Sequence, residues 1–98
     1  MDEHTFRARL WAWQAREDSW VFLTVPAEVS DEIGGGLHEP RGFGSVPVRV
    51  TLGGSTWETS VFPSKEEDAY VLPVKRPVRR AEGVDVGDEV DVRLEVRG

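Results

Sequence analysis

Residues 70–96 read YVLPVKRPVRRAEGVDVGDEVDVRLEV, and this stretch decides the fold of the 98-residue chain. A short apolar run leads into a basic, proline-containing segment at 75–82, which is typical of a short helix that begins near a proline. Apolar residues then alternate strictly with charged ones from Val90 to Val96, as in a half-buried strand. The stretch therefore predicts a strand, a short helix and a second strand.

Strand and helix signals also occur in the N-terminal half of the chain. Gly53-Gly54 separates two strand-like runs and predicts a tight hairpin, because both glycines tolerate positive φ. A second short helix is predicted at 26–34. Six strands and two short helices in one chain of this length indicate a single mostly-β domain over 1–98, a small double-split β-barrel. The strands are predicted at 5–13, 20–25, 46–52, 55–62, 69–74 and 90–96.

Two segments of the chain look like copies of one another. WVFLTVPAEVSDEIGG at 20–35 aligns with AYVLPVKRPVRRAEGV at 69–84, so that Val25 falls on Val74 and Pro26 falls on Lys75. Each copy is a strand, a short helical turn and an exit that contains glycine. The pattern predicts two halves related by an approximate twofold axis, with an acidic first helix and a basic second one.

Composition limits the classes of function. Twelve Lys and Arg against 18 Asp and Glu give a net charge of −6, which argues against general affinity for nucleic acid, so we expect weak or no duplex binding at physiological salt. The chain has no cysteine, which removes disulfides and thiolate chemistry. The first ten residues lack the apolar core of a signal peptide, and no apolar run approaches the roughly 20 residues that span a bilayer. We expect a cytoplasmic protein without membrane contact.

Catalytic and metal-binding signatures are weak. His4 and His38 have no partner at metal-ligand spacing. Ser60 has no histidine or lysine base placed by the local sequence, and no Gly-Lys-Ser/Thr follows the glycines of 34–44. The sequence therefore predicts no catalytic residue, metal or cofactor and favours a protein that is not an enzyme.

The basic helix is the candidate ligand site. Its cations are Lys75, Arg76, Arg79 and Arg80. Arg79 and Arg80 could hold a phosphate or carboxylate, but the helix could also pair with the acidic first helix or present a solvated face. We expect Arg79 to be the most constrained of the four, with a carboxylate of the first helix, a strand-end carbonyl or a bound anion as its acceptor.

Tryptophans mark two further candidate surfaces. Trp57 and Ser60 could line a pocket with the basic helix, although a tryptophan buried in a barrel wall is the alternative. Trp11 and Trp13 point outward from the first strand. Two exposed tryptophans would suggest a covered or partner-facing surface.

The basic unit also resembles known families. Leu72-Pro73, Arg79 and Gly87-Asp88 are similar to the half-barrel of AbrB- and MazE-type swapped-hairpin proteins. Over nearly its full length, the chain more closely resembles a small bacterial family of unknown function that occurs alone or fused to YdeI/OmpD-associated (bacteriocin-protection-like) domains. That resemblance implies a double-split barrel closed within one chain and no established activity. It rests on Trp20-Val21-Phe22, Val25-Pro26, Val48 to Leu52, Gly53-Gly54, Trp57 to Pro63, Tyr70 to Pro73, Arg79 and Gly87-Asp88.

Three functions remain open at this point. The first is a non-enzymatic binding or interaction module that presents its basic helix to a protein partner or a small anionic ligand. The second is a nucleic-acid-binding protein, by analogy of fold with AbrB-type proteins. The third is an accessory subunit of an enzyme. The expected oligomeric state is a monomer or a weak homodimer.

Overall fold

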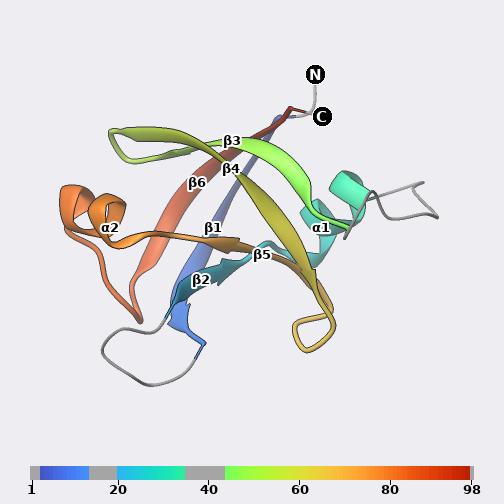
Figure 1. Ribbon diagram of the computed structural model, residues 1–98, viewed down its shortest axis with the longest axis horizontal. Helices are drawn as coiled ribbons and strands as arrows, with labels where there is room; N and C mark the ends of the chain where they lie inside the picture. The colour runs from blue at the N-terminus through green and yellow to red at the C-terminus, as the bar shows by residue number, and fades with distance from the viewer. Residues whose placement is uncertain (1–2, 14–19, 35–43, 98) are drawn as a thin grey trace.

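The fold is a closed, six-stranded antiparallel barrel with a helix at each end (Figure 1). The computed structural model describes residues 3–13, 20–34 and 44–97. Neither helix in these ranges is long and apolar enough to cross a bilayer. The predicted mostly-β barrel is confirmed, and its elements differ from the predicted ones only at their ends. They are β1 (Glu3–Ala12), β2 (Val21–Thr24), α1 (Ala27–Gly34), β3 (Val46–Leu52), β4 (Ser55–Ser64), β5 (Ala69–Pro73), α2 (Arg76–Glu82) and β6 (Glu89–Val96).

Aliphatic side chains at alternate strand positions fill the barrel. Successive strand residues point to opposite faces, so the apolar half of each alternating run faces inward and the charged half faces solvent. In β6, for example, Val90, Val92 and Leu94 are buried, while the intervening residues Asp91 and Arg93 are exposed. The most deeply buried side chains are Leu10, Leu23, Leu72, Leu94, Val25, Val48, Val50, Val61 and Val74.

The chain divides into two halves of the same design. Each half runs strand, strand, helix, strand, and the turn at Gly53-Gly54 joins β3 of the first half to β4 of the second. In the strand order β1-β2-β5-β4-β3-β6, exchanging the halves leaves the order of neighbours unchanged. The barrel is therefore a pseudo-twofold object within one chain, as the paired segments predicted.

The pairing of β2 with β5 shows the symmetry at the level of single residues. Leu23 lies opposite Leu72, and both side chains are fully buried. The alignment that places Val25 on Val74 places Leu23 on Leu72, so the twofold axis passes through this pair.

Two hydrogen bonds flank the Leu23–Leu72 pair symmetrically. The Val25 amide donates to the Tyr70 carbonyl at 2.9 Å. The Val74 amide donates to the Val21 carbonyl, also at 2.9 Å. The alignment of 20–35 with 69–84 makes these two bonds equivalent. The duplication therefore includes the backbone hydrogen bonds between β2 and β5.

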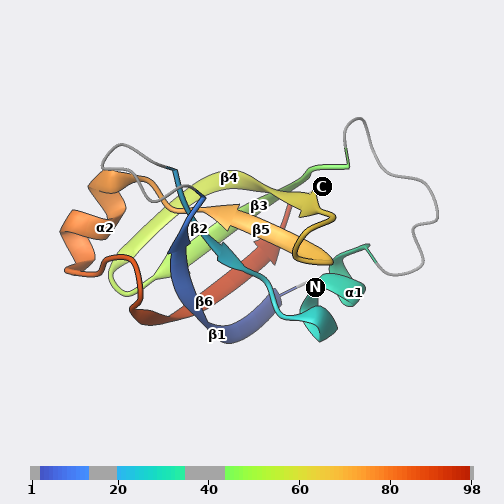
Figure 2. The ribbon, with the colours of Figure 1, turned by 90° about the horizontal axis from the view of Figure 1, so that it is seen from below.

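The two helices do not pair with each other, so this alternative for the basic helix is excluded. Figures 1 and 2 place α1 and α2 at opposite ends of the barrel. Helix α1 follows β2 and helix α2 follows β5. Because these two strands are antiparallel, they end at opposite ends of the barrel, and so the helices lie there too. One acid of α1, Glu32, instead lies 3.0 Å from Nδ1 of His4 on β1.

The central leucine pair should carry a large share of the stability. We expect Leu23→Ala and Leu72→Ala each to lower the free energy of unfolding by about 2–5 kcal/mol, because each leaves a cavity at the same symmetric position. Denaturant unfolding measures both, with Val86→Ala, at an exposed position, as a control that should change stability by less than about 0.5 kcal/mol. A small effect at either leucine would show that the pair is not the centre of the core.

Candidate functional site

Local sequence fixes both ends of α2. Pro77 lies in the first turn, where its missing amide costs no helical hydrogen bond. At the other end, Gly83 adopts a left-handed conformation with φ of 66°, and the Val84 amide donates to the Arg79 carbonyl at 3.0 Å. This is the Schellman arrangement that ends many helices, and it turns the chain toward β6.

Hydrogen bonds to Glu82 connect α2 to the turn between the two halves. Its carboxylate accepts hydrogen bonds from the Gly54 amide at 3.0 Å and from the Ser55 hydroxyl. The Ser55 hydroxyl, followed by the Gly54 amide, lowers the pKa of Glu82 from its ordinary value. Gly53 has φ of 60°, and a Cβ there would collide with the Glu82 carboxylate. The positive φ favours glycine at this position, and a larger residue would also displace the Glu82 carboxylate from its hydrogen bonds.

Arg79 is held against the barrel rather than extended into solvent. Its Nε donates to the Val74 carbonyl at 3.1 Å, and Nη1 lies 3.8 Å from Oδ1 of Asp85. The side chain is only 15% exposed, whereas Arg80 and Lys75 are exposed. Of the three acceptors that the sequence left open for Arg79, the structure shows the strand-end carbonyl.

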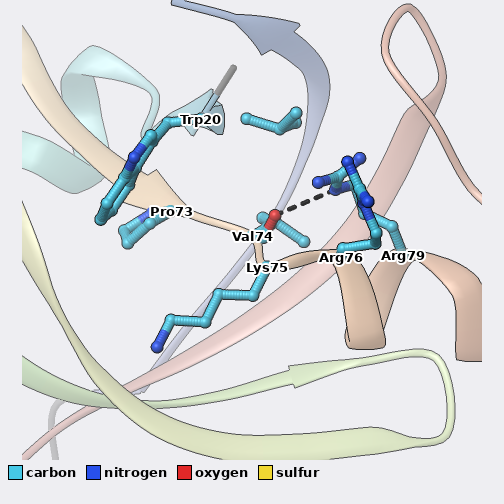
Figure 3. A pocket seen from close by; sticks show the side chains of 7 residues that line it. Trp20, Pro73, Val74, Lys75, Arg76 and Arg79 are labelled. Carbon is cyan, nitrogen blue, oxygen red and sulfur yellow. Dashed lines mark hydrogen bonds between the residues drawn. The ribbon is translucent and has the colours of Figure 1, made fainter. Parts of the chain in front are cut away.

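A pocket of about 320 Å³ opens where β2 begins, β5 ends and α2 starts; we call it the α2 pocket. Figure 3 shows Trp20 on one side of the Val74 segment and the two arginines on the other. Trp20 is 61% exposed, so its ring is available to a ligand. Apolar surface and three cationic side chains therefore meet in one hollow. The lining residues are Trp20, Val21, Pro73, Val74, Lys75, Arg76 and Arg79.

A second pocket lies on another side of the same helix. It has a volume of about 580 Å³ and combines basic side chains of α2 with the turn that follows the helix. Asp85 contributes a carboxylate to this pocket, which makes it less favourable to an anion than the α2 pocket. Its lining residues are Arg76, Arg79, Arg80, Gly83, Val84 and Asp85.

The six residues predicted as one site are only partly brought together. The four cations of the basic segment border the two pockets, but neither Trp57 nor Ser60 is among the described residues that line them. Trp57 is half-buried and packs against the core from β4, and Ser60 lies on β4 opposite Pro47. Sequence reasoning missed Trp20 as a pocket residue, although the register of β2 and β5, if extended by two residues, would have placed it opposite Lys75.

The outward face of β1 and β2 carries a group of aromatic rings. Trp11 packs on Phe22 with ring centroids 5.4 Å apart, and its indole N–H donates to the Thr24 hydroxyl at 2.9 Å. Trp11 is thus half-buried, and the expectation that it would be exposed is wrong. Trp13 is 61% exposed, as expected, and Trp20 stacks on Phe22 with centroids 6.2 Å apart.

The described residues show no cluster suited to metal binding. Within 3–13, 20–34 and 44–97, no three histidine or carboxylate side chains gather closely enough to hold a metal ion. His38 lies outside these ranges. Apart from Glu82, the carboxyl group with a shifted pKa is that of Glu58, which is lowered chiefly by a hydrogen bond from Arg49. A lowered pKa keeps both carboxyl groups ionised near neutral pH.

The profile of a domain of unknown function, DUF1905, matches residues 6–94. The chain belongs to this family. No curated protein matches the chain. The match confirms the predicted membership of a family of unknown function.

Arg79→Lys should destabilise the protein while Arg80→Lys should not. Lysine keeps the charge but cannot place a guanidinium N–H on the Val74 carbonyl, so we expect a loss of about 1 kcal/mol in the free energy of unfolding. Arg80 is exposed, so its substitution should change stability by less than about 0.5 kcal/mol. Denaturant titrations of both variants make the comparison, and equal effects would contradict a structural role for Arg79.

The hydrogen bonds of Glu82 should appear as a pH dependence of stability. Because its pKa is lower in the folded state, this group contributes stability above its unfolded pKa and loses it as the pH falls through the folded pKa. We expect the stability difference between the parent chain and Glu82→Gln to shrink as the pH is lowered from 7 through the carboxyl range. Thermal melts at a series of pH values test this, and a constant difference would disprove the linkage.

Proposed function

We propose that this protein is a non-enzymatic binding module whose α2 pocket holds the anionic group of a small ligand or of a protein partner. The observation that carries the proposal is the pocket's composition. Lys75, Arg76 and Arg79 border a hollow that also contains the exposed ring of Trp20 and the apolar surface of Pro73. Ligand sites commonly combine such apolar surface with a few placed polar groups.

Two properties of the cations favour anion binding. Arg79 is already oriented by the Val74 carbonyl, so a ligand need not order its long side chain. Its Nε makes that bond and its Nη1 lies 3.8 Å from the Asp85 carboxylate, so a bound carboxylate or phosphate would compete with exposed Asp85 for the terminal N–H groups. Lys75 is exposed, and its flexible side chain could bring its ammonium group to a bound carboxylate or phosphate.

A nucleic-acid role receives less support. Four basic side chains lie in or next to α2, namely Lys75, Arg76, Arg79 and Arg80, whereas α1 at the opposite end of the barrel carries Glu28, Asp31 and Glu32. Binding to a duplex depends on neutralising several phosphates along a surface, and a single short basic helix offers few such contacts. The likeness to AbrB- and MazE-type proteins and a role as an accessory subunit stay predictions from sequence, as does the cytoplasmic location.

Ligand-dependent thermal stabilisation tests the proposal. Phenyl phosphate, at constant ionic strength, should raise the melting temperature of the parent chain progressively, since a ligand that binds the folded state stabilises it. Lys75→Ala should weaken the affinity by about fivefold to tenfold, the loss of one charge-assisted contact. Lys65→Ala, which removes a lysine far from α2, is the matched control and should bind like the parent.

Phosphate-type anions also stabilise many proteins without binding, so the variants decide the outcome. Equal stabilisation of the parent, Lys75→Ala and Lys65→Ala would indicate a general salt effect and would overturn the proposal. Absence of any stabilisation would overturn it as well.

A further inference from the structure

Exposed aromatic side chains concentrate on one side of the barrel. Among the described residues, the large apolar side chains that are exposed are Trp13, Trp20, Phe62 and Val86. The three aromatic ones belong to the outward side of four neighbouring strands, β1, β2, β5 and β4, which we call the aromatic face. Exposed apolar patches of this kind often mark a surface that another molecule covers.

Two cross-strand aromatic pairs lie on β1 and β2. Trp11 is opposite Phe22, and the Trp13 amide donates to the Trp20 carbonyl at 3.0 Å, which continues the same register by one more outward pair. Because side chains alternate, both pairs point away from the barrel core. Such pairs stabilise a hairpin. That role accounts for the half-buried Trp11 and Phe22, but Trp13 and Trp20 are each 61% exposed.

Apolar residues continue this face across β5 and β4. Val71 and Pro73 point outward from β5, opposite Thr24 and Phe22, and both are buried. Among the buried aliphatic residues that the structure describes, Val71 is the one that does not belong to the barrel core. Phe62 lies opposite Val71 on β4 and is 43% exposed. The aromatic face therefore has an apolar layer of its own, outside the core.

The opposite side of the barrel has a different surface. There, charged side chains of β6 form ion pairs with those of the neighbouring β1. Arg7 lies 3.2 Å from Glu89, and Arg93 lies 3.4 Å from Glu3. Ion-paired, exposed side chains suit a surface that faces water. The apolar surface is thus concentrated on one side of the molecule.

The aromatic face carries opposite charges at its two ends. At one end, Figure 3 shows Lys75 on the same side of its segment as Trp20. At the other end, the Thr24 hydroxyl donates to the Glu67 carboxylate at 2.9 Å, which places this carboxylate on the face. Glu67 belongs to the turn at 65–68, which holds three carboxylates and one lysine. A basic end and an acidic end are therefore separated by apolar surface.

We infer that the aromatic face is the interface of a homodimer, in which a second copy of this chain packs face to face. With the twofold axis in the plane of the contact and across the strands, the basic end of each copy meets the acidic end of the other. Lys75 of each copy then lies near Glu67 of the second copy, and the exposed rings are covered. This inference rests on the proposed function and names its protein partner, because the second copy supplies the anionic group to the α2 pocket.

Charge complementarity favours a second copy over the other surfaces that attract aromatic residues. Nucleic acids and anionic membranes would meet the carboxylates of 65–68 on this face, and the chain has a net charge of −6. A second copy offers apolar surface to the rings and the opposite charge to each end. Aromatic residues are also enriched where two proteins meet.

Sedimentation velocity over a range of concentrations tests the interface. The 11.0 kDa parent chain should shift from monomer to dimer between about 1 and 500 μM, the range of a weak complex. Trp13→Ser should raise the dissociation constant by about tenfold or more, as expected for a central ring. Val86→Ser, at an exposed apolar position outside the aromatic face, is the control and should dimerise like the parent.

Two results of this experiment would overturn the inference. One is a parent chain that stays monomeric over the whole range of concentrations. The other is a Trp13→Ser variant that dimerises like the parent.

Charge reversal tests how the two copies are oriented. Lys75→Glu and Glu67→Lys should each weaken self-association by about tenfold, because like charges then meet at both ends. An equal mixture of the two variants should recover the affinity of the parent, since each contact then joins opposite charges. Asp91→Lys, which makes the same change of charge on β6, is the control. A mixture that associates no more tightly than each variant alone would overturn the inference.

Phenyl phosphate separates this inference from the proposed function. Trp13 is not among the described residues that line the α2 pocket, so phenyl phosphate should stabilise Trp13→Ser as it stabilises the monomeric parent. At concentrations where the dimer forms, the probe should compete with Glu67 of the second copy and raise the dissociation constant of the dimer. A parent chain that is stabilised by phenyl phosphate but never dimerises would overturn the inference alone. A dimer that is insensitive to both charge reversals, together with no stabilisation by phenyl phosphate, would overturn both.

Discussion

The structure depends on the antiparallel pairing of β2 with β5 around Leu23 and Leu72. These two side chains face each other at the centre of the barrel, and the twofold relation of the halves passes through them. The register of this one pair determines which strand ends meet each helix and which residues lie opposite one another at the α2 pocket. A shift of one residue would turn both leucines outward and would empty the core at its centre, so the register is strongly specified.

The ends of the central strands present the next constraint. A strand that stops at a buried position leaves a carbonyl that must find a donor, and the helix that follows each strand supplies it. Ser30 and Arg79 are the two donors. A serine closes the junction completely because its hydroxyl both donates and accepts, whereas an arginine satisfies the carbonyl and brings a charge to the surface. The two ends of the barrel therefore differ chemically at this pair of positions.

Strands and hairpin could be predicted from the sequence because alternation is a local signal, which Val90, Val92 and Leu94 show clearly. The duplication could be predicted for the same reason, since two similar local patterns recur. Contacts between segments that are distant in the sequence could not be predicted. Whether the acidic and basic helices pair could not be decided from the sequence, because the answer depends on β2 and β5 running in opposite directions. Trp11 was expected to be exposed because alternation shows which face a residue occupies but not that Phe22 and Thr24 cover it. Trp20 lies at the pocket because of the register between β2 and β5, which no local sequence pattern shows.

Joining the two halves in one chain has a consequence for how such a barrel can change. Two separate, identical halves would carry the same residue at both positions 30 and 79, so any substitution would appear twice and would alter both junctions together. The turn at Gly53-Gly54 removes this restriction. One junction can keep a serine that both donates and accepts a hydrogen bond, while the other carries an arginine. Covalent linkage thus permits a division of labour that a symmetric homodimer of the same halves could not achieve.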